Sequence, residues 1–257
     1  MAPCTITFDG QTIKSLIDDE KCSLSDTDLF DSLRIKNKNV QVKNSKFYLP
    51  NYDLDLMQGI LSKGTQYFEQ NVLEALDSFL NNNSIVIDIG ANIGNYTLYW
   101  ANESKVKKIY AFEPIHYLFK ILEINTKINK IEDKVVLNNC GLADKICSGE
   151  IKYFSDSDLN DVKLKVLQSD TKFVIPLKTL DSCNIKERKI DLIKIFVKGM
   201  EKEVLIGATK TIKKHKPAIV IESFDNNYED TNSILKRMGY KLETNFGSNI
   251  YLYTHKG

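Results

Sequence analysis

The sequence lacks the features that mark disulfide-bonded and zinc-binding proteins. Its 257 residues contain five cysteines, an odd number, and none of them forms a Cys-x-x-Cys pair. Structural zinc sites use closely spaced cysteine and histidine ligands, and disulfide frameworks use paired cysteines in secreted chains. We therefore expect reduced cysteines, a reducing compartment and no structural zinc.

Long apolar segments and an excess of one charge are also missing. No stretch approaches the roughly 20 apolar residues of a membrane-spanning helix, and the amino terminus lacks the basic start and apolar run of a secretory signal. The net charge is +1, so the chain has no global basic field that would attract nucleic acid. These absences predict a cytoplasmic protein without a membrane span, and they leave its oligomeric state open.

The most informative segment is a strand-like run, Ile85–Ile89, that leads into a glycine-containing turn. Apolar residues without alternation are typical of a strand buried on both faces in a parallel sheet. Gly90 and Gly94 allow a tight turn into a helix, and a Cβ at Gly90 is expected to obstruct a nucleoside at the backbone. Because position 95 holds Asn, the turn does not match the Gly-x-Gly-x-x-Gly spacing, and a dinucleotide is disfavoured.

A second strand-like run, Lys108–Phe112, ends at Glu113. The separation of Glu113 from Gly90 is close to the roughly 20 residues expected between a glycine turn and the acid that binds a ribose. An ordinary surface acid is the alternative for Glu113 alone. Combined with the turn, Glu113 is predicted to bind two ribose hydroxyls.

The rest of the chain alternates between strand and helix patterns. Residues 1–80 are predicted to form a helical and hairpin cap, and residues 81–257 the main part of the same domain. Residues 145–178 interrupt the alternation, which predicts an excursion from the main sheet. The elements expected are a hairpin over 40–49, a helix over 68–79, a crossover helix after Glu113, strands over 134–140, 191–197, 218–221 and 250–253, and a helix that ends at Gly239.

Together these landmarks resemble a class I S-adenosylmethionine-dependent methyltransferase, and more narrowly the FkbM family. The resemblance covers roughly residues 53–253 and rests on Val86–Tyr96, Phe112–Pro114, Lys178–Asp181, Asp191–Ile195 with Gly199–Glu201, Leu205–Ala208 and Pro217–Glu222. It implies a Rossmann-like α/β fold with a seven-stranded sheet in the order 3-2-1-4-5-7-6, the last strand antiparallel, and helices on both faces.

The same resemblance implies S-adenosylmethionine as the cofactor and a hydroxyl of a sugar or other small acceptor as the substrate, with surface glycan biosynthesis as an analogy. Glu113 would hold the ribose hydroxyls, and Glu69 would lie near the cofactor's amino-acid end. The residues implied around the methionine, ribose and adenine portions are Asp88, Gly90, Ala91, Asn92, Gly94, Gly141 and Leu142.

The chain departs from the family at the end of the fourth strand. The family pattern Ile-Asp-Val-Glu-Gly-x-Glu is replaced by Ile-Phe-Val-Lys-Gly-Met-Glu over residues 195–201. Phe196 stands where relatives carry an aspartate facing the reacting methyl, and phenylalanine can neither accept a proton nor bind a cation. Because hard cations need several converging oxygens, we expect no required metal.

Lys198 and Glu222 are the candidate catalytic residues, and Phe196 and Lys198 are expected to line the acceptor site. Lys198 could act as a base if burial near the sulfonium disfavours its ammonium form, or it could bind a phosphorylated or nucleotide-linked sugar. Its alternative is to point into solvent, and the alternative for Glu222 is a salt-bridged acid. An O-methyltransferase is expected first, with an N-methyltransferase and a methyltransferase-like binding module without chemistry as alternatives.

Overall fold

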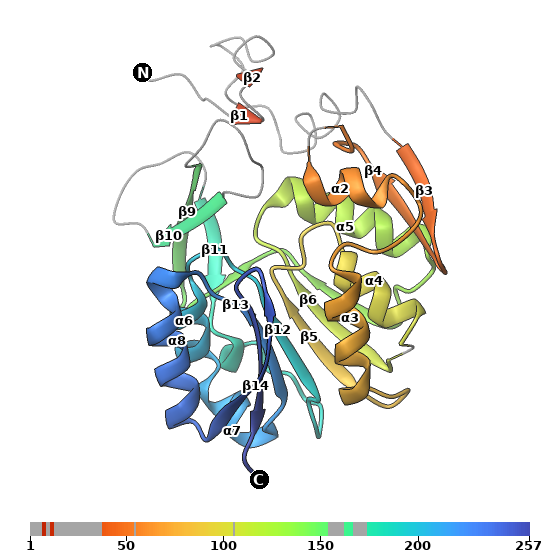
Figure 1. The fold of residues 1–257 in the computed structure, drawn as a ribbon. Coiled ribbons are helices and arrows are strands. Elements are labelled where there is room, and N and C mark those ends of the chain that lie inside the picture. Colours follow the sequence, from red (N-terminus) through yellow and green to blue (C-terminus); the bar gives the residue numbers. More distant parts are fainter. Residues whose placement is uncertain are drawn as a thin grey trace.

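A seven-stranded sheet organises the chain (Figure 1). The computed structural model describes residues 7–8, 11–12, 38–53, 55–104, 106–153, 162–166 and 174–257. The strands of the sheet are β5 (Ile85–Ile89), β6 (Lys108–Phe112), β7 (Val135–Asn138), β12 (Leu192–Ile195), β13 (Ala218–Glu222), β14 (Tyr240–Gly247) and β15 (Ile250–His255).

These strands lie in the order β7-β6-β5-β12-β13-β15-β14, which is 3-2-1-4-5-7-6 when they are numbered along the chain. Strands β7 to β13 are parallel neighbours, and β15 is antiparallel to both β13 and β14. The order reverses between β5 and β12, which is where open α/β sheets bind their ligands. The predicted Rossmann-like α/β class is confirmed.

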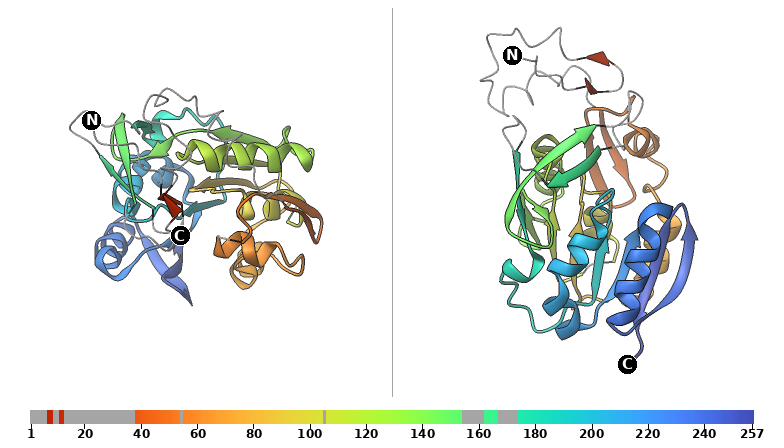
Figure 2. Two further views of the ribbon diagram at one scale, coloured as in Figure 1. Left: turned by 90° about the horizontal axis from the view of Figure 1, so that it is seen from above. Right: turned by 90° about the vertical axis from the view of Figure 1, so that its left-hand side faces the viewer.

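Both faces of the sheet are covered by helices, as Figures 1 and 2 show. Alternate strand residues enter separate cores: Val86 and Val220 pack into one, and Ile87 and Ile219 into the other. Burial on both faces explains why the strand runs show no alternation. None of the helices in the described ranges is long and apolar enough to cross a bilayer. The covering helices are α3 (Gln70–Leu76), α4 (Asn95–Asn102) and α5 (His116–Ile128) on one face, and α6 (Glu201–Gly207), α7 (Thr209–His215) and α8 (Asp225–Arg237) on the other.

The predicted hairpin is confirmed as β3 (Lys38–Val42) and β4 (Ser45–Leu49), which pair antiparallel. It is followed by α2 (Leu56–Leu61), and the expected helix over 68–79 consists of α3 and a 3₁₀ turn (Asp77–Phe79). Phe47 of the hairpin shares its core with Val86 of β5. Most of the predicted cap before residue 38 lies outside the described residues, apart from the short strands β1 (Thr7–Phe8) and β2 (Gln11–Thr12).

The predicted excursion forms a second sheet beside the main one. Strand β8 pairs parallel with β11, and β9 pairs antiparallel with β11 and β10. Because Gly141 belongs to β8, the third strand of the main sheet is shorter than the predicted 134–140. The strands of the second sheet are β8 (Gly141–Leu142), β9 (Cys147–Tyr153), β10 (Val162–Val166) and β11 (Val174–Lys178), and a 3₁₀ turn (Leu180–Ser182) follows.

Two further boundaries differ from the sequence predictions. Strand β14 was not predicted as a strand; it is an edge strand with mostly exposed side chains and register shifts against β15, so it has no continuous apolar run. The fourth strand, β12, ends at Ile195 rather than at 197. Phe196 and Lys198 therefore lie in the loop beyond the strand, where their side chains can reach a ligand.

Asn125 of α5 joins the hairpin to the glycine turn. It is fully buried; its Oδ1 accepts a hydrogen bond from the Tyr48 N–H at 2.7 Å, and its Nδ2 donates to the Ile93 carbonyl at 2.8 Å. Replacing Asn125 by Ala leaves a buried donor and a buried acceptor unpaired, so we expect the free energy of unfolding to fall by about 2–4 kcal/mol. Urea denaturation measures the change. The exposed Asn83→Ala is the control, and equal stability of the two variants would contradict this role.

Candidate active site

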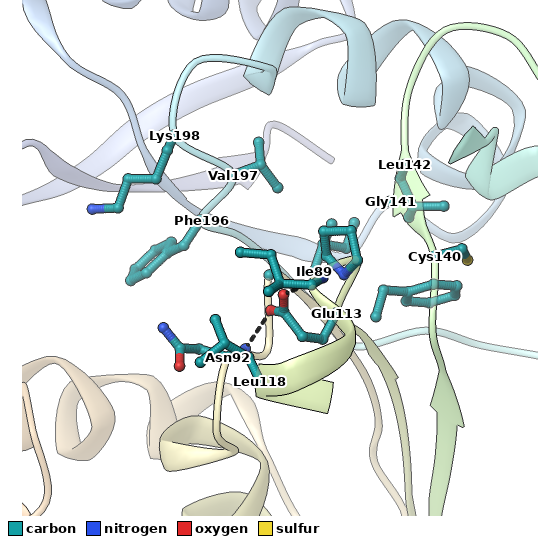
Figure 3. A pocket seen from close by; sticks show the side chains of 14 residues that line it. Ile89, Asn92, Glu113, Leu118, Cys140, Gly141, Leu142, Phe196, Val197 and Lys198 are labelled. Atoms are coloured by element: carbon teal, nitrogen blue, oxygen red, sulfur yellow. Dashed lines mark hydrogen bonds between the residues drawn. The ribbon is translucent and has the colours of Figure 1, made fainter. Parts of the chain in front are cut away.

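A pocket opens at the carboxyl ends of β5, β6 and β12, at the reversal of strand order (Figure 3). It contains about 700 Å³ of space, part of it open to solvent. The lining residues are Ile89, Gly90, Asn92, Phe112, Glu113, Pro114, Ile115, Leu118, Cys140, Gly141, Leu142, Phe196, Val197 and Lys198.

The turn after β5 has left-handed backbone at Gly90, Asn92 and Gly94, with φ of 77°, 53° and 98°. A Cβ at Gly90 would lie 1.9 Å from the Phe196 carbonyl oxygen. The end of the neighbouring strand therefore requires a glycine at this position, independently of any ligand. At Gly94, which precedes α4, a Cβ would lie 2.7 Å from Leu122.

Glu113 follows β6 and is 3% exposed. One carboxylate oxygen accepts a hydrogen bond from the Asn92 N–H at 2.8 Å, and the other accepts one from the Ile115 N–H at 2.9 Å. Burial raises the pKa of Glu113 to about 7, although both hydrogen bonds and the Lys194 charge lower it. A carboxylate offers about four acceptor positions, so each oxygen can accept a further donor from a ligand.

The side of the pocket away from Lys198 is mainly apolar (Figure 3). Cys140 and Leu142 are 4% and 2% exposed, and Pro114 lies opposite them. Gly141 brings the backbone of β8 close to Pro114, because a Cβ there would lie 3.5 Å from its ring and 2.5 Å from Leu177.

Two residues expected around the cofactor lie beneath the turn rather than in the pocket. Asp88 is fully buried; its Oδ1 accepts from the Lys194 ammonium at 2.8 Å and its Oδ2 from the Thr97 hydroxyl at 2.6 Å. Ala91 is 3% exposed and donates its N–H to the Phe112 carbonyl at 3.0 Å. Neither residue lines the pocket, and both support the turn from inside.

Lys194 is the site residue that sequence reasoning missed. It lies in the middle of β12 and is 2% exposed. The signal in the sequence is a lysine inside one apolar strand and Asp88 inside another, which the strand register places side by side. Charged residues are almost never fully buried unless they are paired, so each of them predicts the other.

The acceptor side of the site is built by the loop after β12. Lys198 has a left-handed backbone (φ 51°), and its ammonium contacts both carboxylate oxygens of Glu222, at 3.0 and 2.9 Å. Its ammonium also lies 5.3 Å from the ring centroid of Phe224. The Lys198 side chain points to Glu222 and is 33% exposed, and Glu222 is a salt-bridged acid at the end of β13. The Phe196 ring packs edge-on against Tyr96, with centroids 5.4 Å apart.

Glu201 closes the same loop. Its carboxylate is fully buried and accepts from the Gly199 N–H at 2.7 Å and from the Asn227 amide at 3.1 Å. Burial raises the pKa of Glu201, against the lowering effect of these hydrogen bonds. Glu201 therefore fixes the turn that carries Lys198.

Glu69 approaches the acceptor side from the residue before α3. It has a left-handed backbone (φ 55°), and its side chain does not cap the helix; its Oε2 accepts from the Tyr96 hydroxyl at 2.8 Å. Burial raises the pKa of Glu69, the Tyr96 bond lowers it, and the Glu222 charge raises it further. Glu69 lies outside the pocket lining but within electrostatic reach of Lys198. No group of three His, Cys, Asp or Glu side chains that could hold a metal ion occurs among the described residues.

The fold is that of a class I methyltransferase, with a pocket at the carboxyl ends of its parallel strands. The model of the methyltransferase FkbM domain matches residues 88–242. Because this match spans more than half of the chain, the chain belongs to the FkbM methyltransferase family. The resemblance seen in the sequence is thereby confirmed.

Relatives of known sequence and structure agree with this family. The chain is 26% identical over 178 residues to methyltransferase sdnD of Sordaria araneosa, which covers 57% of this chain and 68% of that protein. It is 23% identical over 184 residues to methyltransferase 1 of Beauveria bassiana strain ARSEF 2860, and this match covers 62% of this chain and 73% of that protein. The crystal structure of methyltransferase FkbM from Methylobacillus flagellatus KT has a TM-score of 0.51 at 20% identity. That likeness concerns the fold; it covers 68% of this chain, which spans less than half, 44%, of the solved chain.

The raised pKa of Glu113 predicts a pH-dependent stability. In the unfolded chain this carboxyl releases its proton near 4.5, but in the folded protein only near pH 7. Between these values the folded state binds more protons, so Glu113 lowers the free energy of unfolding by about 3 kcal/mol as the pH rises through this window. Urea denaturation of wild type and Glu113→Gln at pH 4.5 and at pH 7.5 measures this effect. The free energy of unfolding of wild type relative to Glu113→Gln should be lower at pH 7.5 than at pH 4.5. A difference that stays constant with pH would contradict the raised pKa.

Proposed function

We propose that the chain is an S-adenosylmethionine-dependent O-methyltransferase that acts on a hydroxyl group of a sugar or another small acceptor, with surface glycan biosynthesis as its setting. The observation that carries the proposal is the buried Glu113 carboxylate, which ends β6 inside the pocket of a methyltransferase-family fold. A carboxylate at this place can accept hydrogen bonds from two ribose hydroxyls.

The residues of the pocket fit the cofactor in their chemistry. Glu113 would hold the ribose hydroxyls, and the turn at Gly90, Asn92 and Gly94 would follow the sugar and methionine portions. Gly141 and Leu142 supply the close backbone and apolar wall that suit adenine. Glu69 would face the amino-acid end. Asp88 and Ala91 would act beneath the turn, without contacting the cofactor.

When bound, S-adenosylmethionine supplies an electrophilic methyl group on a positively charged sulfur. The remaining chemistry is to hold the acceptor in line and to take up the proton that its hydroxyl loses. We assign proton uptake to the Glu222 carboxylate. The Lys198 ammonium contacts both Glu222 oxygens and fixes the orientation of this carboxylate. Lys198 is therefore an acceptor-side positioning group rather than a base.

The cofactor assignment is tested by calorimetric titration with S-adenosylhomocysteine. Glu113→Ala removes the proposed ribose partner and also frees the Asn92 N–H, so the affinity should fall at least about tenfold, or about 1.4 kcal/mol. Glu123→Ala, a carboxylate on the outer face of α5, is the control. Unchanged affinity of Glu113→Ala would remove the ribose assignment.

The reaction is tested by incubating the protein and S-adenosylmethionine with a panel of free sugars, nucleotide sugars, small alcohols and amines. Mass spectrometry should find one added CH₂ on a hydroxylated acceptor, with equal S-adenosylhomocysteine formed, and the rate should not change with a chelator. Methylation of amines alone would favour an N-methyltransferase. Tight cofactor binding with no methylated acceptor would favour a binding module.

Lys198→Met should lower the turnover of that acceptor at least about tenfold while the affinity for S-adenosylhomocysteine stays within about twofold. The reason is that Glu222 loses the cation that positions it. Lys202→Met is the matched control, because Lys202 forms a similar pair with Asp230 but is about half exposed, 49%. Full activity of Lys198→Met would make Lys198 a bystander.

A further inference from the structure

We infer that Lys194 is a positioning residue that holds the cofactor turn against the loop facing the acceptor. This inference rests on the proposed role of the turn in binding S-adenosylmethionine. It gives a function to a buried lysine that neither the family match nor the proposed reaction assigns.

The ammonium of Lys194 bridges two parts of the turn. It donates to Asp88 Oδ1 at 2.8 Å and to the Gly90 carbonyl at 2.8 Å. Asp88 is the fourth residue of β5, and Gly90 is the first residue of the turn. Lys194 therefore fixes the direction in which the chain leaves β5. Thr97 of α4 donates to the other oxygen of Asp88, which ties the start of the following helix to the same pair.

Three further contacts of the turn come from β6, the neighbouring strand on the other side of β5. The N–H groups of Gly90 and Ala91 donate to the Phe112 carbonyl, at 2.9 and 3.0 Å. The Asn92 N–H donates to Glu113. All three bonds connect the turn to β6 and its end, whereas Lys194 connects it to β12. The turn is thus held from both neighbouring strands.

The same ammonium contacts the aromatic wall of the acceptor side. It lies 4.5 Å from the ring centroid of Phe196 and 5.1 Å from that of Tyr96. Cations within about 6 Å of a ring centroid are attracted by its π face. Phe196, which replaces the family's aspartate, is therefore a partner of Lys194, and a displacement of Lys194 would reach the cofactor turn and the acceptor wall together.

A positioning role explains the pair better than stability does. Replacing a buried ion pair by apolar residues is often neutral or stabilising. Breaking only one member leaves an unpaired buried charge, so the test needs both changes. The double variant Asp88→Asn with Lys194→Met carries no charge at either position. It keeps an acceptor for the Thr97 hydroxyl, but it lacks the hydrogen bond to the Gly90 carbonyl. If it does not fold, Asp88→Asn with Lys194→Gln takes its place, with the same expectations.

The first measurement is amide hydrogen exchange of the protein without ligand. In the double variant, exchange at Ala91 and Asn92 should rise at least about tenfold relative to Leu252 and Tyr253 of β15, because only the turn is released. An equal rise at all these amides, or no rise at the turn, would overturn the inference.

The second measurement is calorimetric titration with S-adenosylhomocysteine, whose affinity should fall at least about tenfold in the double variant. Lys189→Met is the control. Lys189 pairs with Asp191 at 2.7 Å just before β12, at the end of the strands away from the pocket. This variant should change neither the amide exchange of the turn nor the affinity. Unchanged affinity in a variant with a loosened turn would overturn the inference. If wild type binds no S-adenosylhomocysteine, the proposed function fails, and the exchange data still decide whether Lys194 holds the turn.

Discussion

The site depends on the close contact between the backbone of Gly90 and the carbonyl of Phe196, where a Cβ would lie only 1.9 Å from the oxygen. Strands β5 and β12 are parallel neighbours, so the chain leaves both at the same edge of the sheet. Because Gly90 has no side chain, the segments that follow β5 and β12 can contact each other. The left-handed backbone of Gly90 then turns the chain toward Glu113. The backbone of Gly90 and Phe196 therefore forms a shared wall between the Glu113 side and the Lys198 side of the pocket.

Much of this architecture follows from local sequence patterns. The runs at 85–89 and 108–112 lack alternation because both faces of the sheet are covered, and Gly94 is needed because Leu122 fills the space of a Cβ. Strand β14 lacks such a signal, since an exposed edge strand needs no apolar run. The Asp88–Lys194 pair was missed because it joins residues 106 positions apart. Only the register of β5 against β12 brings them together, and local periodicity contains no register between distant strands.

The departure from the family at 196 and 198 alters the charge balance of the site without leaving unmatched groups. Lys198 faces Glu222, and Lys194 faces Asp88, so each lysine of this region neutralises one carboxylate. Phe196 packs against Tyr96 and under the Lys194 ammonium, which makes it part of the wall rather than a vacant catalytic position. Proton uptake would then depend on a carboxylate that a lysine already orients.

Glu113 links stability to ligand binding through one buried carboxyl group. Desolvation makes its ionised form costly in the free protein, and the N–H groups of Asn92 and Ile115 offset this cost only in part, since its pKa is still raised to about 7. Hydroxyl donors from a ribose would favour the ionised form, because a carboxylate accepts more hydrogen bonds than a protonated acid. A nucleoside would therefore be bound together with the release of a proton near neutral pH. In the protein without ligand, the desolvation of the ionised Glu113 carboxylate is unfavourable. The hydroxyl donors of a nucleoside would offset this desolvation free energy.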